Sequence, residues 1–107
     1  MAATDEKDRP KGYVCFGKRP LADGVYDLYW IVVDPDERRR GVGKELLEAV
    51  EAAIKARGAR MLIAETSGLD ANRTVRDFYI RSGFKEEARI KVFYRIGDDI
   101  VIYARRF

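Results

Sequence analysis

The segment from Asp34 to Leu47, DPDERRRGVGKELL, has the residue types and spacing of an anion-binding loop. It places Gly41 and Gly43 two positions apart, just before a stretch with helical periodicity. The N–H groups at a helix start have no partner within the helix, and the helix dipole makes that end positive. Glycine lets a phosphate approach the backbone closely because it has no side chain. The segment therefore predicts a pyrophosphate site at a helix N-terminus.

Four basic side chains add positive charge to this segment: Arg38, Arg39, Arg40 and Lys44. The spacing differs from that of both common nucleotide loops. A Walker loop needs Gly-x-x-x-x-Gly-Lys-Ser/Thr, which is absent, and a Rossmann fingerprint needs a third glycine where Leu46 stands. Taken alone, the two glycines fit a phosphate site and an ordinary helix start with a solvated basic run equally well.

The acid–base chemistry open to the chain is narrow. Its 107 residues include no histidine and one cysteine, Cys15. The usual general base and the histidine-dependent catalytic triads are therefore excluded, and we expect no metal. Carboxylates, tyrosine, lysine, cysteine and water remain. Cys15 lies in an apolar run, where packing is the more common role, and a single cysteine fits a reducing cytoplasm.

Hydrophobic patterning predicts the elements around the glycine segment. The runs 12–17 (GYVCFG) and 25–33 (VYDLYWIVV) are rich in β-branched and aromatic residues and predict strands. An apolar stripe predicts a helix over about 41–57, ended by Gly58. The run 61–65 (MLIAE) predicts a buried parallel strand. Strand, helix and strand then form one right-handed βαβ crossover.

The remaining sequence predicts a second helix and a hairpin. The helix should span about 71–82, with Val75, Phe78 and Tyr79 facing inward. The hairpin should pair 84–95 with 100–105. The predicted fold is α/β, a mixed sheet with a central βαβ crossover, in one domain over 12–107 after a polar leader at 1–11.

Two motifs together resemble the GNAT superfamily of N-acetyltransferases. The first is Arg38-x-x-Gly41-x-Gly43, directly after a strand ending in Ile-Val-Val. The second is Asn72 followed by Phe78-Tyr79-x-x-x-Gly83-Phe84. The resemblance covers about 12–107 and implies a GNAT-like acyl-CoA N-acyltransferase fold. It also implies transfer of an acetyl group from acetyl-CoA to a primary amine of a small molecule or peptide. The alternative is a non-catalytic CoA-binding subunit or a truncated acetyltransferase.

The resemblance implies roles for single residues. Tyr79 would lie near the sulfur and donate a proton to the departing thiolate, with packing in the core as the alternative role. Asn72 would bind the pantetheine arm or the backbone beside it. The pantetheine would pair with the backbone of Ile31, Val32 and Val33. The pyrophosphate would lie on the segment made of Arg38, Arg39, Arg40, Gly41, Val42, Gly43 and Lys44.

The general base is left open between two carboxylates. Asp27 and Glu65 are the candidates because they lie on the two predicted strands that flank the cofactor. Each is equally compatible with an ordinary ion-paired or solvated carboxylate. Family members often use water relays, so a dedicated base is not required.

The sequence departs from the family at its start. The usual domain opens with a strand, two helices and a further strand before anything that matches Gly12. The strand at 12–17 would then be an edge with exposed apolar side chains, and such edges pair with other chains. We therefore expect a homo-oligomer, a partner chain at this edge, or a truncated protein.

Charge and hydropathy disfavour two other classes of function. The formal net charge is +3, and the basic residues alternate with acidic ones. This pattern, without a recognised nucleic-acid motif, disfavours nucleic-acid binding. No apolar run reaches the roughly 18 residues of a membrane span, so we expect no membrane insertion.

Overall fold

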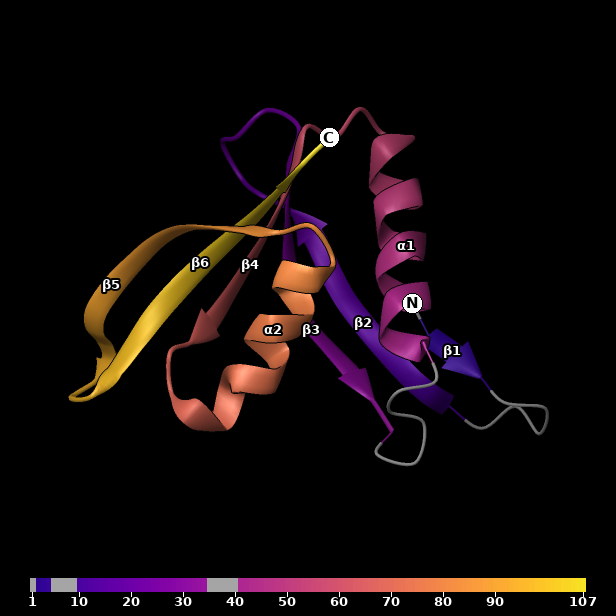
Figure 1. Cartoon of the computed structure of the whole chain (residues 1–107). Coiled ribbons are helices and arrows are strands. Elements are labelled where there is room, and N and C mark those ends of the chain that lie inside the picture. The colour runs from indigo at the N-terminus through magenta and orange to yellow at the C-terminus, as the bar shows by residue number, and fades with distance from the viewer. Residues whose placement is uncertain (1, 5–9, 35–40) are drawn as a thin grey trace.

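The computed structural model describes residues 2–4, 10–34 and 41–107. Within these residues, six strands form one mixed sheet in the order β1-β2-β3-β4-β6-β5, accompanied by two α-helices (Figure 1). The elements are β1 Ala2–Thr4, β2 Pro10–Lys18, β3 Val25–Val33, α1 Val42–Lys55, β4 Met61–Ser67, the 3₁₀ turn η2 Asp70–Asn72, α2 Arg73–Arg81, β5 Lys85–Arg95 and β6 Asp98–Arg106. The predicted α/β fold with a central βαβ crossover is confirmed.

Both α-helices pack on the same face of the sheet. Their inward side chains join one buried cluster with residues of β2, β3, β4 and β6. Val50 and Ile54 of α1 are fully buried, as are Leu62 and Ala64 of β4. Burying one such leucine or isoleucine contributes about 1.5–3 kcal/mol. The apolar stripe of α1 therefore fixes the position of the helix on the sheet.

The first residues of the chain differ from the prediction. We expected a polar leader at 1–11, but β2 begins at Pro10 and Ala2–Thr4 pairs with it as β1. The beginning of β2 is therefore covered rather than an open edge. Val14, expected to be exposed on that edge, is 3% exposed and belongs to the core cluster. The cause is strand alternation, which turns Val14 toward α1.

The second helical region also differs from the prediction. Asp70–Asn72 forms a 3₁₀ turn, and the α-helix begins only at Arg73. Tyr79 is buried as predicted, and Phe78 packs partly buried against the core. Val75 was expected to face inward but is 39% exposed.

A fork divides the middle of the sheet. The parallel strands β3 and β4 pair from Val25 and Met61 up to Leu28 and Ala64, and no pairing continues beyond that point among the described residues. Both strands run on past it and diverge toward their C-terminal ends (Figure 1).

A bulge in β3 accompanies the fork. On β2 the partners of Trp30 and Leu28 are the adjacent residues Cys15 and Phe16, so Tyr29 is an extra residue in the ladder. An extra residue bends its strand and increases its local twist. β3 therefore bends where its pairing with β4 ends.

Among the described residues, no helix is long and apolar enough to cross a membrane.

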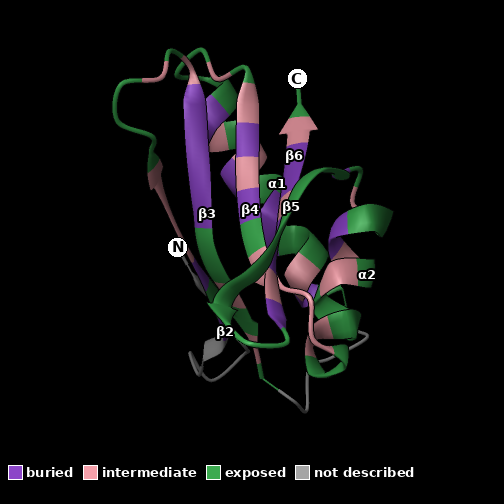
Figure 2. Ribbon diagram, turned by 90° about the vertical axis from the view of Figure 1, so that its left-hand side faces the viewer, coloured by how far each residue is buried: buried purple, intermediate pink, exposed green. Residues whose placement is uncertain are grey.

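The outer strand β5 is exposed along its whole length, whereas the buried residues of β3, β4 and β6 lie toward the middle of the sheet (Figure 2). Stability should therefore be concentrated in the central strands.

A pair of substitutions tests this distribution. Leu62→Ala should lower the free energy of unfolding by about 2–5 kcal/mol, because it leaves a cavity in the packed core. Ile90→Ala on β5 removes a side chain that is already 50% exposed and should change the free energy by about 0.5 kcal/mol or less. Equilibrium denaturant unfolding measures both, and equal losses would contradict the assignment of the core.

Candidate active site

The N-terminus of α1 has the geometry of an anion site. Gly41 precedes the helix at φ +77°, a left-handed conformation that favours glycine. The first intrahelical bond runs from the Glu45 N–H to the Gly41 carbonyl at 2.9 Å. The N–H groups of Val42, Gly43 and Lys44 precede that bond, so no carbonyl of the helix accepts from them. Arg38, Arg39 and Arg40 lie outside the described residues.

The space around the two glycines differs. A Cβ placed on Gly41 would meet no described atom within 4 Å, so this position is open. A Cβ on Gly43 would lie 3.3 Å from the Phe78 ring and 3.7 Å from Val33 Cγ2. The start of α1, the end of β3 and α2 therefore meet at Gly43. The structure thus brings together parts of the chain that the two sequence motifs contain.

The inner edge of the fork continues from this meeting point. The ladder between β3 and β4 ends at Leu28, so the backbone of Ile31 to Val33 has no described β4 partner along that edge. The side chains of Ile31 and Val33 pack against the core cluster, which holds the strand in place. An extended ligand with amide groups could pair with such an edge as an added strand.

Tyr79 lies in the core beside the fork. It is 4% exposed, with the rings of Phe84, Tyr103 and Phe78 at centroid distances of 5.2, 5.8 and 5.9 Å. Burial raises the pKa of Tyr79 to about 12. A thiol has an ordinary pKa near 8.5, so at equilibrium this phenol keeps its proton in the presence of a thiolate. It suits donation of a hydrogen bond better than complete transfer of a proton.

Asn72 lies in the turn between β4 and α2. It is half-buried, and its backbone N–H donates to the Leu69 carbonyl at 3.0 Å. Arg76 fixes this turn by donating to the carbonyls of Ser67 at 2.9 Å and Leu69 at 2.6 Å. Arg76 carries no sequence signal of this role, since nothing in its local pattern indicates bonds to the preceding turn.

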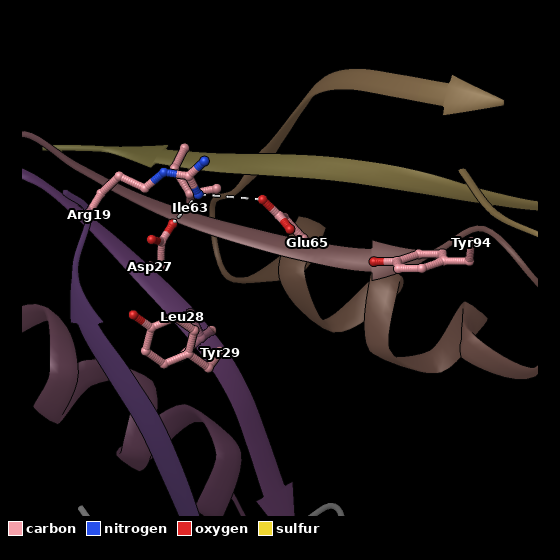
Figure 3. Close-up of a pocket in the computed structure, with 7 residues that line it drawn as sticks. All are labelled: Arg19, Asp27, Leu28, Tyr29, Ile63, Glu65 and Tyr94. Atoms are coloured by element: carbon pink, nitrogen blue, oxygen red, sulfur yellow. Dashed lines mark hydrogen bonds and ion pairs between the residues drawn. The ribbon is translucent and has the colours of Figure 1, made fainter. Parts of the chain in front are cut away.

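The two candidate bases face one pocket of about 230 Å³ (Figure 3). Asp27 points away from the helices, because its neighbours Tyr26 and Leu28 face the core cluster. Asp27 is 8% exposed, and the Glu65 side chain is 43% exposed. The pocket is lined by Arg19, Asp27, Leu28, Tyr29, Ile63, Glu65 and Tyr94. Asp27 and Glu65 therefore line one pocket from neighbouring strands, and their role as a base stays a prediction.

Arg19 joins the two carboxylates. Its Nη1 lies 3.1 Å from Asp27 Oδ1 and 3.6 Å from Glu65 Oε1. The hydrogen bond to Asp27 and the charge of that carboxylate raise the pKa of Arg19. Sequence reasoning missed Arg19 because it lies in the turn KRPLADG, which has no functional pattern.

Among the described residues, no three His, Cys, Asp or Glu side chains are grouped to hold a metal.

Tyr94 reaches the pocket through a distortion of β5. The register of β5 on β6 slips between Ile90 and Arg95, and Val92 adopts φ +50°. Asp99 holds this distortion by accepting the Val92 N–H at 3.0 Å and an Arg89 Nη1 bond at 3.1 Å. The backbone bond and the guanidinium lower the pKa of Asp99. Sequence reasoning missed Tyr94 because a bulge has no signal in an alternating run.

Comparison with known proteins identifies the family. The acetyltransferase (GNAT) domain family model matches residues 1–86. The chain belongs to the GNAT acetyltransferase family. The resemblance inferred from the two sequence motifs is confirmed.

Three relatives illustrate the match. S-(2-succino)cysteine N-acetyltransferase from Bacillus subtilis is 29% identical over 69 residues, which are 64% of this chain and 42% of that protein. A Desulfovibrio desulfuricans structure described as a GNAT-family acetyltransferase is 45% identical, with a TM-score of 0.95 over 98% of this chain and 65% of its own. A Bacillus anthracis structure described as a streptothricin acetyltransferase, in complex with acetyl coenzyme A, shares the fold at 19% identity. Its TM-score is 0.89 over 99% of this chain and 60% of that chain. Our chain thus spans between 42% and 65% of these relatives.

Two glycines at opposite ends of α1 provide a matched test of the anion site. Gly41 and Gly58 have φ +77° and +82°, and a Cβ on either meets no described atom within 4 Å. Gly41→Ala and Gly58→Ala should each cost roughly 1–2 kcal/mol of stability, because both force a left-handed alanine. Only Gly41→Ala should weaken acetyl-CoA binding, by about tenfold, measured by calorimetric titration. Equal affinities for the two variants would refute the pyrophosphate assignment.

Proposed function

We propose that the protein is an acetyl-CoA-dependent N-acetyltransferase that acetylates a primary amine of a small molecule or peptide. The observation that carries this proposal is the fork that opens beyond Leu28 and Ala64, because its β3 edge ends at Val33 beside the N-terminus of α1. A fork supplies an edge for an amide-containing arm, and the helix start supplies amides for a pyrophosphate. CoA contains both groups: its amide-containing pantetheine arm is followed by a pyrophosphate.

The chain's residues fit acetyl-CoA along the fork. The amides of Val42, Gly43 and Lys44, with Arg38, Arg39 and Arg40, would hold the pyrophosphate. The backbone of Ile31, Val32 and Val33 would pair with the pantetheine, and Asn72 would contact it from the turn before α2. When bound, acetyl-CoA supplies an acetyl group joined to sulfur as a thioester.

The reaction requires a proton to move from nitrogen to sulfur, because an amine and a thioester become an amide and a thiol. Glu65 is the better placed of the two candidate bases, since its side chain is 43% exposed and can return a proton to solvent. Asp27 is buried and hydrogen-bonded to Arg19 at 3.1 Å. We therefore assign proton acceptance to Glu65, directly or through water, and the placement of Arg19 to Asp27.

Tyr79 would act on the sulfur. Its neutral phenol can donate a hydrogen bond to the thiolate as negative charge develops there. A bond to a charged group contributes about 1.5–3 kcal/mol, more than one to a neutral group. Tyr79 would therefore stabilise the departing sulfur more than the intact thioester, which is the condition for faster turnover.

The second candidate function is CoA binding without catalysis. It is favoured by the engagement of both carboxylates with Arg19, which leaves neither Asp27 nor Glu65 without a cationic partner. Incubation with acetyl-CoA and a mixed set of amines, with detection of free thiol, separates the two functions. Saturable binding without amine-dependent thiol release would favour the binding module.

The proposal also includes a partner chain or a second copy of this chain. Among the described residues the outer strands of the sheet are β1 and β5, and every residue of β5 is exposed. Outer strands with free backbone groups pair readily with other chains. Light scattering on the purified protein would report the oligomeric state, and a monomer at all concentrations would contradict self-association.

Removing one hydroxyl tests the role of Tyr79. Tyr79→Phe should lower kcat by about 10- to 100-fold, as expected for loss of a hydrogen bond to a charged group. The Kd for acetyl-CoA should stay nearly constant. Tyr103→Phe is the matched control, since Tyr103 is 3% exposed and packs on Tyr79. A similar loss of kcat and affinity in both variants would assign Tyr79 to packing instead.

A further inference from the structure

The pocket at the fork also indicates what kind of amine it takes. Resting on the proposed acetyl transfer, we propose that the acceptor is a small amine that enters as a single cation and carries no carboxylate. Glu65 binds its ammonium group, and the pair of Asp27 and Arg19 rejects acceptors with a carboxylate beside the amine. Arg19 is thereby a specificity-determining residue.

The position of the pocket indicates that the acceptor amine would enter the fork from this side. Asp27 and Leu28 are among the last residues of β3 that pair with β4, and Glu65 is the first β4 residue beyond the pairing. The pocket thus lies at the point where β3 and β4 separate. Its charged residues face away from the helices, whereas Tyr79 belongs to the cluster under the helices. An amine in the pocket and the phenol of Tyr79 would reach the fork from opposite faces.

The charges of the pocket sum to minus one. Arg19 contributes one positive charge, and Asp27 and Glu65 contribute two negative charges. An ammonium ion neutralises this pocket, and Glu65 is the accessible partner because it lies further from Arg19 than Asp27 does, at 3.6 Å against 3.1 Å. Partial exclusion of water strengthens such a pairing relative to bulk solvent.

The same arrangement disfavours a carboxylate on the acceptor. Coulomb energy falls with the reciprocal of distance, so two like charges cancel one opposite charge when they lie about twice as far away. Both Asp27 and Glu65 lie within 3.6 Å of the Arg19 Nη1. A carboxylate bonded to Arg19 would therefore share that cation with two carboxylates that already pair with it, which leaves little net attraction. The cost of removing its water then makes binding unfavourable.

The walls and size of the pocket favour a compact apolar body on the amine. Tyr29, Ile63 and Tyr94 line it around the charged group, with the hydroxyl end of Tyr94 toward the pocket (Figure 3). Aromatic rings pack against apolar groups and attract cations through their faces. The volume of about 230 Å³ is below the about 300–1,000 Å³ of sites for drug-sized ligands. An arylalkylamine has the size and chemistry that these walls accept.

Matched acceptors that differ only in a carboxylate test the proposal. The full chain is incubated with acetyl-CoA and either tyramine or tyrosine, and either phenethylamine or phenylalanine, and the release of free thiol is followed. We expect kcat/KM to be at least about tenfold higher for each amine than for its amino acid. Equal values, or a preference for the amino acids, would overturn the proposal while leaving acetyl transfer intact.

Failure of the proposed function would be seen separately. Calorimetric titration of acetyl-CoA precedes the acceptor assay, and absence of binding would refute the acetyltransferase assignment and with it the acceptor class. Binding together with turnover of cadaverine but not of either arylalkylamine would overturn the monocationic part of the proposal.

Variants that remove one negative charge test whether the pocket residues set the preference for an amine over the matching amino acid. Asp27→Asn should reduce the preference for tyramine over tyrosine by about tenfold, since one of the two repelling charges is lost. Glu65→Gln should reduce the same tyramine-to-tyrosine preference. Because Glu65 is half-exposed, this variant replaces Asp27→Asn as the test if the substitution at the buried position prevents folding. The ratio is informative even if Glu65 is the base, because loss of a base slows both acceptors alike. Asp23→Asn removes the same charge from the exposed loop outside the pocket and should leave the ratio unchanged. An unchanged ratio in folded Asp27→Asn and Glu65→Gln would overturn the assignment.

Discussion

The extra residue in β3 is the constraint on which the site depends. Before the bulge, Tyr26 and Leu28 face the helices and Asp27 faces the opposite side; after it, Ile31 and Val33 face the helices. A regular β3 would keep one alternation throughout and could continue its ladder with β4. The bulge instead ends the pairing, opens a backbone edge and leaves both Tyr29 and Trp30 half-exposed. One irregularity thus provides the edge for an extended ligand and lets Ile31 and Val33 pack under the helices although Asp27 faces the opposite side.

The position of the α1 N-terminus, the candidate pyrophosphate site, follows from packing rather than from charge. The buried stripe of α1 packs mainly against β2 and β3 and leaves the helix little freedom to slide, so the helix start is held next to the end of β3. At Gly43 the neighbouring Phe78 ring and Val33 side chain would meet any added Cβ. Close packing against the Phe78 ring therefore favours glycine at position 43, while the left-handed backbone favours glycine at position 41. The two glycines of one motif have different physical reasons.

Sequence reasoning reached the parts of the site that depend on local pattern. Gly41, Gly43 and Tyr79 belong to segments whose periodicity and spacing fix their element, and the fold brings Gly43 against Phe78, the neighbour of Tyr79. Arg19 and Tyr94 could not be found in this way. Arg19 acts through contacts with Asp27 and Glu65, distant in sequence, and Tyr94 depends on a bulge held by Asp99. The pairing of Ala2–Thr4 with β2 was missed because the polar segment around it has no pattern typical of a strand. Only the contact with β2 shows that these residues form one.

The two faces of the sheet offer different environments to the two proton-transfer roles of the proposed acetyl transfer. The helix face is dry, and burial there raises the pKa of Tyr79 to about 12, so the phenol stays protonated and available as a donor. The opposite face carries the charged groups, and Arg19 keeps two carboxylates together that would otherwise repel each other. A donor must stay neutral and an acceptor must stay charged, and a single environment stabilises only one of these states. A fork that passes through the sheet between the two faces lets one reacting group contact both environments at once.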